Sequence, residues 1–225
     1  MNKKEILKCI YNHGGEFLNY SFSQEGEDMI LDTLLENKKN GFYVDFGALH
    51  PYRFSNTARF YERGWSGVNV DANPDSIMLF NRMRHRDINV EAGLSENENE
   101  TLIFYRFKEN ALSTFDAEKA EKLIKAGWEL DCKLSIKTKS AMHILDEYVQ
   151  KQHIDFMDID IEGFDEKIIN SIDWDIYHPT IIMTERECCQ KIEPYSILTD
   201  RGYEIVAQTG RTVFYMVKDT QRECK

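Results

Sequence analysis

Long apolar runs are absent from this sequence of 225 residues. A helix that crosses a bilayer needs about 20 consecutive, mostly apolar residues, and no stretch of the chain approaches that length. The N-terminal segment MNKKEILKC is charged and contains no signal-peptide core. We therefore expect no membrane insertion and a cytoplasmic location.

Positive charge is also scarce. The chain has 28 Lys and Arg residues against 39 Asp and Glu residues, and its net charge is -11. Nucleic acid is not expected as a main partner, because neutralising phosphates requires a basic face. Four basic residues do cluster at Arg82, Arg84, His85 and Arg86. They form either a local basic patch or, more simply, the solvated end of a helix, where cations are favoured.

Cysteine and proline are few and follow no pattern. The five cysteines are odd in number and show no CxxC spacing, so we expect reduced thiols, with no disulfide framework and no zinc site. The chain has four prolines, and no segment rich in proline, glycine or serine divides it. We expect a single domain over residues 1–225, because this length is enough for a sizeable α/β core.

The stretch GFYVDFGALHP, residues 41–51, predicts the central strand of the fold. Its aromatic and β-branched residues favour a strand, and its almost wholly apolar character is typical of a strand buried on both faces. Gly47 then permits a sharp turn and a close approach of the backbone to a ligand. Asp45 lies near the strand end and is either a ligand-facing carboxylate or a turn acid.

Strand and helix patterns alternate along the rest of the chain. Strands are predicted at 67–71, 88–92, 101–107, 133–138, 154–161, 180–184, 203–208 and 212–218, and helices at 3–11, 55–64, 74–84, 117–126, 140–150, 164–171 and 193–200. The alternation predicts a mostly parallel sheet with helices on both faces. The short glycine turn at 209–211 predicts a closing antiparallel hairpin. Residues 1–40 are expected to form an N-terminal helical cover, and residues 97–139 an insert.

Acidic residues gather at the ends of the predicted strands. Asp45, Asp71 and Glu185 each end a strand. The strand predicted at 154–161 carries Asp158 and Asp160 and is followed by Glu162; because these three acids are two positions apart, an extended chain has them on one face. Carboxylates buried there without partners would be costly. We therefore expect them to face a ligand, a metal ion or water at the carboxyl edge of the sheet.

Asp71 indicates the type of ligand. It follows Asp45 by 26 positions (71 − 45 = 26), and an acid at the end of the second strand can bind ribose hydroxyls. The first turn lacks the G-x-G-x-x-G pattern of dinucleotide-binding proteins, and the chain has no Walker A pattern. An adenosine ligand without phosphates, such as S-adenosylmethionine, fits these features better.

The stretch SQEGED, residues 23–28, admits two interpretations. In the first, Ser23 caps a helix whose early turns carry Glu27 and Asp28, where acids are favoured. In the second, Gln24 and Asp28 reach into a site as hydrogen-bonding groups. The sequence favours the first.

Several motifs together resemble the FkbM family of methyltransferases. They are SQEGED at 23–28, GFYVDFGALHP at 41–51, SNT at 55–57, GWSGVNVDANP at 64–74 and DIDIEGFD at 158–165. The resemblance implies a Rossmann-like class I fold with a mostly parallel seven-stranded sheet and a C-terminal antiparallel hairpin. It also implies S-adenosylmethionine as the cofactor and O-methylation of a sugar or natural-product hydroxyl as the reaction.

The resemblance assigns roles to individual residues. It implies that the cofactor is bound by Gln24, Asp28, Asp45, Gly47, Asp71, Ala72, Gly93, Leu94 and Asp160. Asp160 and Glu162 match an acidic motif close to the transferring methyl group. One departure is Leu49-His50, because related sequences often have two histidines before the proline of this turn.

A hydroxyl acceptor needs a general base. His50 is best suited by its ordinary pKa, with Asp160 or Glu162 as the alternative base or as its orienting partner. His50 is equally compatible with a turn histidine bonded to the backbone. A less favoured mechanism has Asp160, Glu162 and Glu185 holding Mg²⁺; the favoured one has no metal.

The expected partner is a small-molecule acceptor, either a sugar or a glycosylated metabolite. The insert at 97–139 and the N-terminal segment are expected to cover its pocket. A homo-oligomer is compatible with the sequence. The runner-up function is a non-catalytic domain of the same fold that binds an adenosine ligand or a protein partner.

Overall fold

A seven-stranded sheet forms the centre of the molecule, a computed structural model that describes residues 4–5, 19–161, 163–186 and 193–218. Its strand order is β3-β2-β1-β7-β8-β10-β9. The strands are β1 (Phe42–Phe46), β2 (Ser66–Asp71), β3 (Ile88–Glu91), β7 (Phe156–Ile159), β8 (Ile181–Glu185), β9 (Tyr203–Gln208) and β10 (Thr212–Val217). β10 pairs antiparallel with both β8 and β9, whereas the pairs from β3 to β8 are parallel. The expected parallel sheet with a closing hairpin is confirmed.

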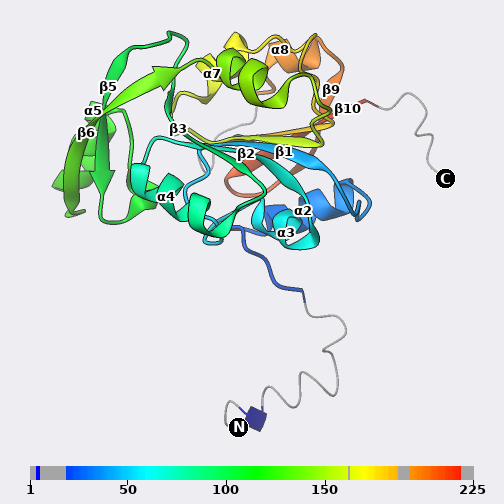
Figure 1. The fold of residues 1–225 in the computed structure, drawn as a ribbon, viewed down its shortest axis with the longest axis horizontal. Coiled ribbons are helices and arrows are strands. Elements are labelled where there is room, and N and C mark those ends of the chain that lie inside the picture. The colour runs from blue at the N-terminus through cyan, green and yellow to red at the C-terminus, as the bar shows by residue number, and fades with distance from the viewer. Residues whose placement is uncertain (1–3, 6–18, 162, 187–192, 219–225) are drawn as a thin grey trace.

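Helices cover both faces of this sheet. They are α2 (Glu27–Leu34), α3 (Ala58–Arg63), α4 (Pro74–Met83), α6 (Ala141–Ile144) with the π-helical turn η3 (Leu145–Val149), α7 (Asp165–Ser171) and α8 (Ser196–Thr199). Figure 1 shows α2, α3 and α4 on one side of the sheet and α7 and α8 on the other. In the described ranges, no helix combines the length and the apolarity that a bilayer span requires.

The central strand β1 is buried on both faces, as its composition predicts. Val44 and Phe46 belong to the core cluster that includes residues of α6 and α7. Tyr43 points the other way, into a cluster with Leu31 of α2 and Phe60 of α3. Alternate side chains of one strand thus join two cores, which fixes the register of β1 and the position of the turn that follows it.

Local sequence signals set the helix that follows β2. Asn73 caps α4, and its side-chain oxygen accepts a hydrogen bond from the Asp75 N–H at 3.1 Å. Pro74 occupies the first helical position, where its missing N–H costs nothing. The end of β2 and the start of α4 are therefore held in a tight connection beside Asp71.

Several predicted elements differ in extent. The strand predicted at 154–161 is only Phe156–Ile159, so Asp160 lies just past its end. The helix predicted at 140–150 begins after its Ser140 cap and changes to the π-helical turn η3. The helix predicted at 193–200 is reduced to Ser196–Thr199. Most of the helix predicted at 3–11 lies outside the described residues.

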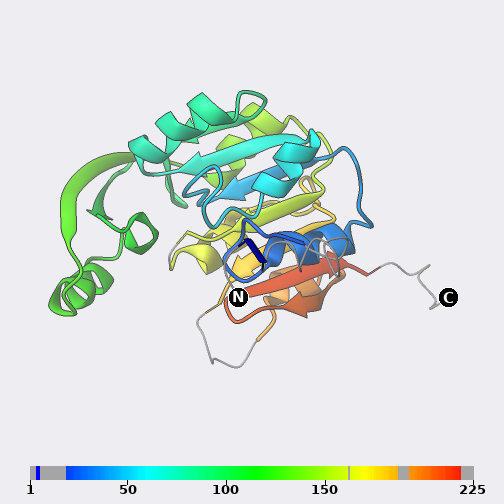
Figure 2. The same cartoon turned by 90° about the horizontal axis from the view of Figure 1, so that it is seen from below.

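A second sheet is formed by the insert predicted at 97–139 together with the two residues of β4 that precede it. Its elements are β4 (Gly93–Leu94), β5 (Thr101–Phe107), the 3-10 turn η2 (Asn110–Leu112), α5 (Ala117–Lys125) and β6 (Leu130–Lys139), with the strand order β4-β6-β5. Figure 2 shows β5, β6 and α5 projecting from the main body as an arm. Gly93 and Leu94, expected at the end of the third strand, instead form the first strand of this second sheet.

Candidate active site

A cavity of about 280 Å³ lies where the parallel strands end. It is lined by residues at the ends of β1, β2, β7 and β8, by residues 110–115 of the insert, and by Gln24 and Arg211. Six acids contribute to its described lining, namely Glu27, Asp45, Asp71, Asp158, Asp160 and Glu185, against the single cation Arg211. Acids predicted to meet at the carboxyl edge of the sheet therefore do meet there.

Gly47 forms the first turn and closely approaches the end of β7. Its φ of 104° lies in the left-handed region, and a Cβ at this position would collide with the backbone oxygen of Asp160. The N–H groups of Gly47 and Ala48 both donate to the Val70 carbonyl oxygen, at 2.9 and 3.1 Å. The turn thus folds over the end of β2 at a position that only glycine fits.

Asp71 ties this turn to the start of α4. Its carboxylate accepts the Leu49 N–H at 2.8 Å and the Asn73 N–H at 2.6 Å. Burial raises the pKa of Asp71 to about 6, although these two hydrogen bonds act to lower it. Each carboxylate oxygen has a further lone pair, so Asp71 can still accept hydrogen bonds from a ligand in the cavity.

Two buried carboxyl groups lie side by side in the floor of the cavity. Asp45 of β1 and Asp158 of β7 are register partners, and each is 4% exposed. Burial raises the pKa of Asp158 to about 7, even though Asn56 Nδ2 donates to its Oδ2 at 2.6 Å. Burial and the Asp158 charge raise the pKa of Asp45 well above its ordinary value. Two such neighbours do not both ionise readily.

Asp158 and Asn56 also line the cavity, although no individual role was predicted for either from the sequence. The spacing of two in DIDIEGFD was the available signal for Asp158, but it could not distinguish Asp158 from Asp160. Asp160 also lines the cavity. Glu162, the other predicted acid of this motif, lies outside the described residues.

His50 is placed in a backbone turn. Its Nδ1 accepts the N–H groups of Tyr52 at 3.0 Å and Arg53 at 2.9 Å. Burial, together with the charges of Arg53 and Arg84, lowers the pKa of His50. A neutral imidazole bonded in this way carries its proton on Nε2, and His50 is not among the described residues that line the cavity. The geometry favours the turn role, and the base role remains a prediction.

The N-terminal motif fits neither interpretation in full. The N-cap of α2 is Gly26 and not Ser23, although Glu27 and Asp28 do lie in the first turn of the helix. Asp28 is fully buried, accepts hydrogen bonds from Ser21 Oγ at 2.6 Å and the Phe22 N–H at 2.9 Å, and donates its own N–H to Ser23 Oγ at 3.0 Å. These bonds shape the loop before α2. Gln24, by contrast, lines the cavity.

Glu27 fixes this loop to the closing hairpin. Its Oε1 accepts hydrogen bonds from Thr209 Oγ1 at 3.1 Å and Thr212 Oγ1 at 3.3 Å, and its Oε2 accepts the Glu25 N–H at 2.8 Å. Glu27 is 2% exposed and lines the cavity. Thr209 and Thr212 lie near the other end of the chain, so local sequence patterns predicted only a helix-start acid at Glu27.

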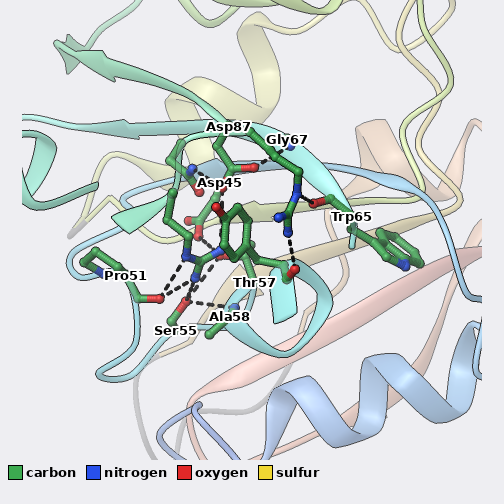
Figure 3. A network of polar contacts seen from close by, with 12 residues as sticks. Asp45, Pro51, Ser55, Thr57, Ala58, Trp65, Gly67 and Asp87 are labelled. Atoms are coloured by element: carbon green, nitrogen blue, oxygen red, sulfur yellow. Dashed lines mark hydrogen bonds and ion pairs between the residues drawn. The ribbon is translucent and has the colours of Figure 1, made fainter. Parts of the chain in front are cut away.

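The interpretation of the basic cluster at 82–86 as the solvated end of a helix is wrong for Arg84, whereas Arg82, His85 and Arg86 are exposed. Arg84 is completely buried, and its guanidinium donates to the Pro51 carbonyl, Ser55 Oγ at 3.2 Å and Tyr43 Oη at 3.2 Å. It also pairs with Asp87 at 3.5 Å. Figure 3 shows this network gathering the loop that follows β1.

Three further residues predicted to bind the cofactor, Ala72, Gly93 and Leu94, have different positions. Ala72 and Leu94 line the cavity, together with Ala92. Gly93 is not among the described lining residues, but a Cβ there would lie 2.8 Å from Cζ of Phe115, which does line the cavity. Gly93 therefore makes room for Phe115 from the insert.

A metal site is not found in the part of the chain that the structure describes. No group of three or more His, Cys, Asp or Glu residues there could hold a metal ion. Because Glu162 lies outside that part, the predicted set of Asp160, Glu162 and Glu185 stays untested.

Comparison with known proteins agrees with this geometry. A model of the methyltransferase FkbM domain matches residues 45–205, from β1 into β9. The chain belongs to the FkbM methyltransferase family. Membership of this family supports methyltransferase activity, for which S-adenosylmethionine is the general methyl donor. Most of the residues that line the cavity belong to the matched FkbM domain.

Two solved structures are similar to this FkbM protein at low identity. One is described as a type 11 methyltransferase from Sulfolobus solfataricus, with a TM-score of 0.41, 11% identity and coverage of 90% of this chain and 98% of that chain. The other is described as a caffeoyl-CoA O-methyltransferase from Staphylococcus aureus, with a TM-score of 0.46, 8% identity and coverage of 97% and 93%. No curated protein matches the sequence.

Proposed function

We propose that this protein transfers a methyl group from S-adenosylmethionine to a hydroxyl group of a small molecule, either a sugar or a glycosylated metabolite. The observation that carries the proposal is the order of side chains along the carboxyl edge of the sheet. Apolar residues line the β3 end, Asp71 follows at β2, and buried acids follow at β1 and β7. This order matches the chemical groups along an extended S-adenosylmethionine molecule.

Each part of the cofactor then has a counterpart. The adenine base would lie at the apolar end near Ala92 and Leu94, and the ribose hydroxyls would donate to Asp71. The cationic sulfonium and ammonium groups would lie beside Asp160 and the Asp45–Asp158 pair, because a carboxylate stabilises a nearby cation. Gly47 brings the backbone close to the cofactor, and Ala72 and Gln24 complete its surroundings. Asp28 and Gly93 contribute indirectly, through the loop before α2 and through Phe115.

The reaction requires alignment and removal of one proton. With S-adenosylmethionine bound, the acceptor oxygen would attack the methyl carbon in line with the carbon–sulfur bond, and S-adenosylhomocysteine would leave as that bond breaks. The hydroxyl proton passes to a carboxylate. Asp158 is the best-placed base, because Asn56 orients it at 2.6 Å and its pKa of about 7 suits a base near neutral pH. Asp160 and Glu162 are the alternative bases, and His50 is less suited by its turn.

The insert supplies the acceptor side of the cavity. Asn110, Ser113 and Thr114 line it from the insert, and such amide and hydroxyl groups can pair with the hydroxyl groups of a sugar. This arrangement supports the expectation that residues 97–139 cover the acceptor. Methyl transfer that survives EDTA would agree with a metal-free mechanism, whereas loss of activity restored by Mg²⁺ would contradict it.

Calorimetric titration with S-adenosylhomocysteine tests the proposal. We expect micromolar binding by the unaltered protein and at least about tenfold weaker binding by Asp71→Ala, because a charged hydrogen-bonding partner of the ribose is lost. Asp200→Ala is the matched control, since Asp200 is exposed and lies at the C-terminal end of α8. A screen of sugars and glycosides for S-adenosylhomocysteine release then identifies the acceptor.

The outcomes separate the two candidate functions. Absence of binding to the unaltered protein would contradict a cofactor-dependent methyltransferase. Binding without methyl transfer to any acceptor would favour a non-catalytic adenosine-binding domain. Equal binding by Asp71→Ala would show that the cofactor does not use this strand end.

A further inference from the structure

Ser76 carries a buried hydroxyl that lacks a partner and belongs to the cavity wall. The residue is 4% exposed, and it lines the cavity at the strand ends. Its Oγ makes no hydrogen bond with any part of the chain that the structure describes. Buried hydroxyls are nearly always hydrogen bonded in proteins, so the partner of Ser76 Oγ is a group outside the described chain, either an ordered water or a polar group of a ligand in the cavity.

The position of Ser76 explains why the chain itself does not satisfy it. Ser76 lies in the first turn of α4, a helix of 10 residues, where serine often bonds to the backbone. Here Asn73 already supplies the cap through the Asp75 N–H. The Ser76 hydroxyl is therefore not needed to stabilise the helix start, and rotation about its Cα–Cβ bond can turn it toward the cavity.

The surroundings of Ser76 select the ligand group. α4 connects β2 with β3, and Ser76 in its first turn lines the same cavity as Ala92 and Leu94, which follow β3. The Ala92 N–H donates to the Asp71 carbonyl oxygen at 3.1 Å, which places the start of the apolar wall directly beside the β2 end. Ala92 and Leu94 continue that wall. A flat, mostly apolar ring with a polar edge suits this combination.

We propose that Ser76 Oγ donates a hydrogen bond to a ring nitrogen of the adenine base of the cofactor and so helps to select adenine. This inference rests on the proposed function, because it assumes that S-adenosylmethionine occupies the cavity. Asp71 then binds the sugar, and Ser76 reads the base. Ser76 follows Asp71 by five positions (76 − 71 = 5), so one short segment recognises both halves of adenosine.

A thermodynamic cycle tests the role of the hydroxyl. The titrations use S-adenosylhomocysteine and its 1-deaza, 3-deaza and 7-deaza analogues, each of which replaces one ring nitrogen by CH. In the unaltered protein, we expect one analogue to bind about threefold to tenfold more weakly than the parent compound. The Ser76→Ala variant should bind the parent compound more weakly than the unaltered protein does, by a similar factor. The variant should bind that analogue as tightly as it binds the parent compound.

Two controls separate recognition from structure. Ser135→Ala removes an exposed hydroxyl from β6 and should bind all four ligands like the unaltered protein. Without ligand, Ser76→Ala should retain the melting temperature of the unaltered protein, because no hydrogen bond within the described chain is lost.

The results distinguish failure of this inference from failure of the proposed function. If the unaltered protein does not bind S-adenosylhomocysteine, both are overturned. If it binds, but Ser76→Ala gives the same four dissociation constants as the unaltered protein, only the role of Ser76 is overturned. Equal weakening of all four ligands by Ser76→Ala would also overturn it, because the hydroxyl would then support the site without reading a ring nitrogen.

Discussion

Asp45 and Asp158 face each other across the β1–β7 ladder, and both carboxyl groups are buried below a cavity lined by further acids. Such a pair is unfavourable for the fold at neutral pH, because one or both charges must be desolvated. It is useful for binding a cation and for accepting a proton. We infer that the stability of the fold is reduced at this position in favour of the site.

The Asp158 pair predicts a characteristic pH dependence of stability. Burial raises the pKa of Asp158 from 3.8 to about 7. Between these values the folded state binds more protons than the unfolded state, so the contribution of Asp158 to the free energy of unfolding decreases as pH rises through this window. Asp158→Asn removes that proton uptake and should gain about 1–3 kcal/mol relative to the unaltered protein between pH 5 and pH 8.

Urea denaturation of both proteins at pH 5, 6, 7 and 8 measures this difference. Asp200→Asn is the control, because Asp200 is exposed. A constant difference between Asp158→Asn and the unaltered protein across the pH range would contradict a raised pKa at Asp158. Retained binding of S-adenosylhomocysteine would verify that the cavity is intact in the variant.

Arg84 predicts a large loss of stability on substitution. Its guanidinium holds Pro51 and Ser55 of the loop after β1 and pairs with Asp87. Arg84→Met keeps most of the side-chain volume but leaves the buried Asp87 without a cationic partner. Breaking a buried pair in this way should lower the free energy of unfolding by about 3–5 kcal/mol.

The neighbouring Arg82 offers a matched control for Arg84. Arg82 is exposed on the same helix, so Arg82→Met should change stability by less than about 0.5 kcal/mol. Chemical denaturation of both variants gives the comparison. Similar small losses for the two would mean that the network in Figure 3 does not stabilise the loop.

The contrast between these two arginines also shows where sequence reasoning reached its limit. Both lie in one basic cluster, and local rules favour a solvated helix end for each. Burial of Arg84 depends on Pro51, Ser55 and Tyr43, which are more than 25 positions away in the sequence and contacted only in the folded state. No local pattern records such contacts.

Features set by neighbouring residues were predicted well. The strand at β1 follows from its own composition, the start of α4 from Asn73-Pro74, and the closing hairpin from the glycine turn at 209–211. The meeting of the acids at the sheet edge follows from strand order. The difference between Asp158 and Asp160 depends on where β7 ends. The choice between a base and a turn role for His50 depends on the path of the turn. Both features depend on tertiary contacts.

Gly47 makes the sharpest demand on the backbone of the site. Its φ is 104°, and a Cβ would meet the backbone oxygen of Asp160. Gly47→Ala should therefore lower the free energy of unfolding by about 2–5 kcal/mol, from strain and overpacking together. It should also weaken S-adenosylhomocysteine binding more than tenfold, because relief of the collision moves the turn away from the end of β7.

Gly127→Ala isolates the effect of backbone strain alone. Gly127 has a φ of 94°, but a Cβ there would meet nothing within 4 Å. It should cost only about 1–2 kcal/mol and leave S-adenosylhomocysteine binding unchanged, as measured by urea denaturation and calorimetry on both variants. If Gly47→Ala lost no more stability or affinity than Gly127→Ala, the close approach of the first turn to Asp160 would not shape the binding site.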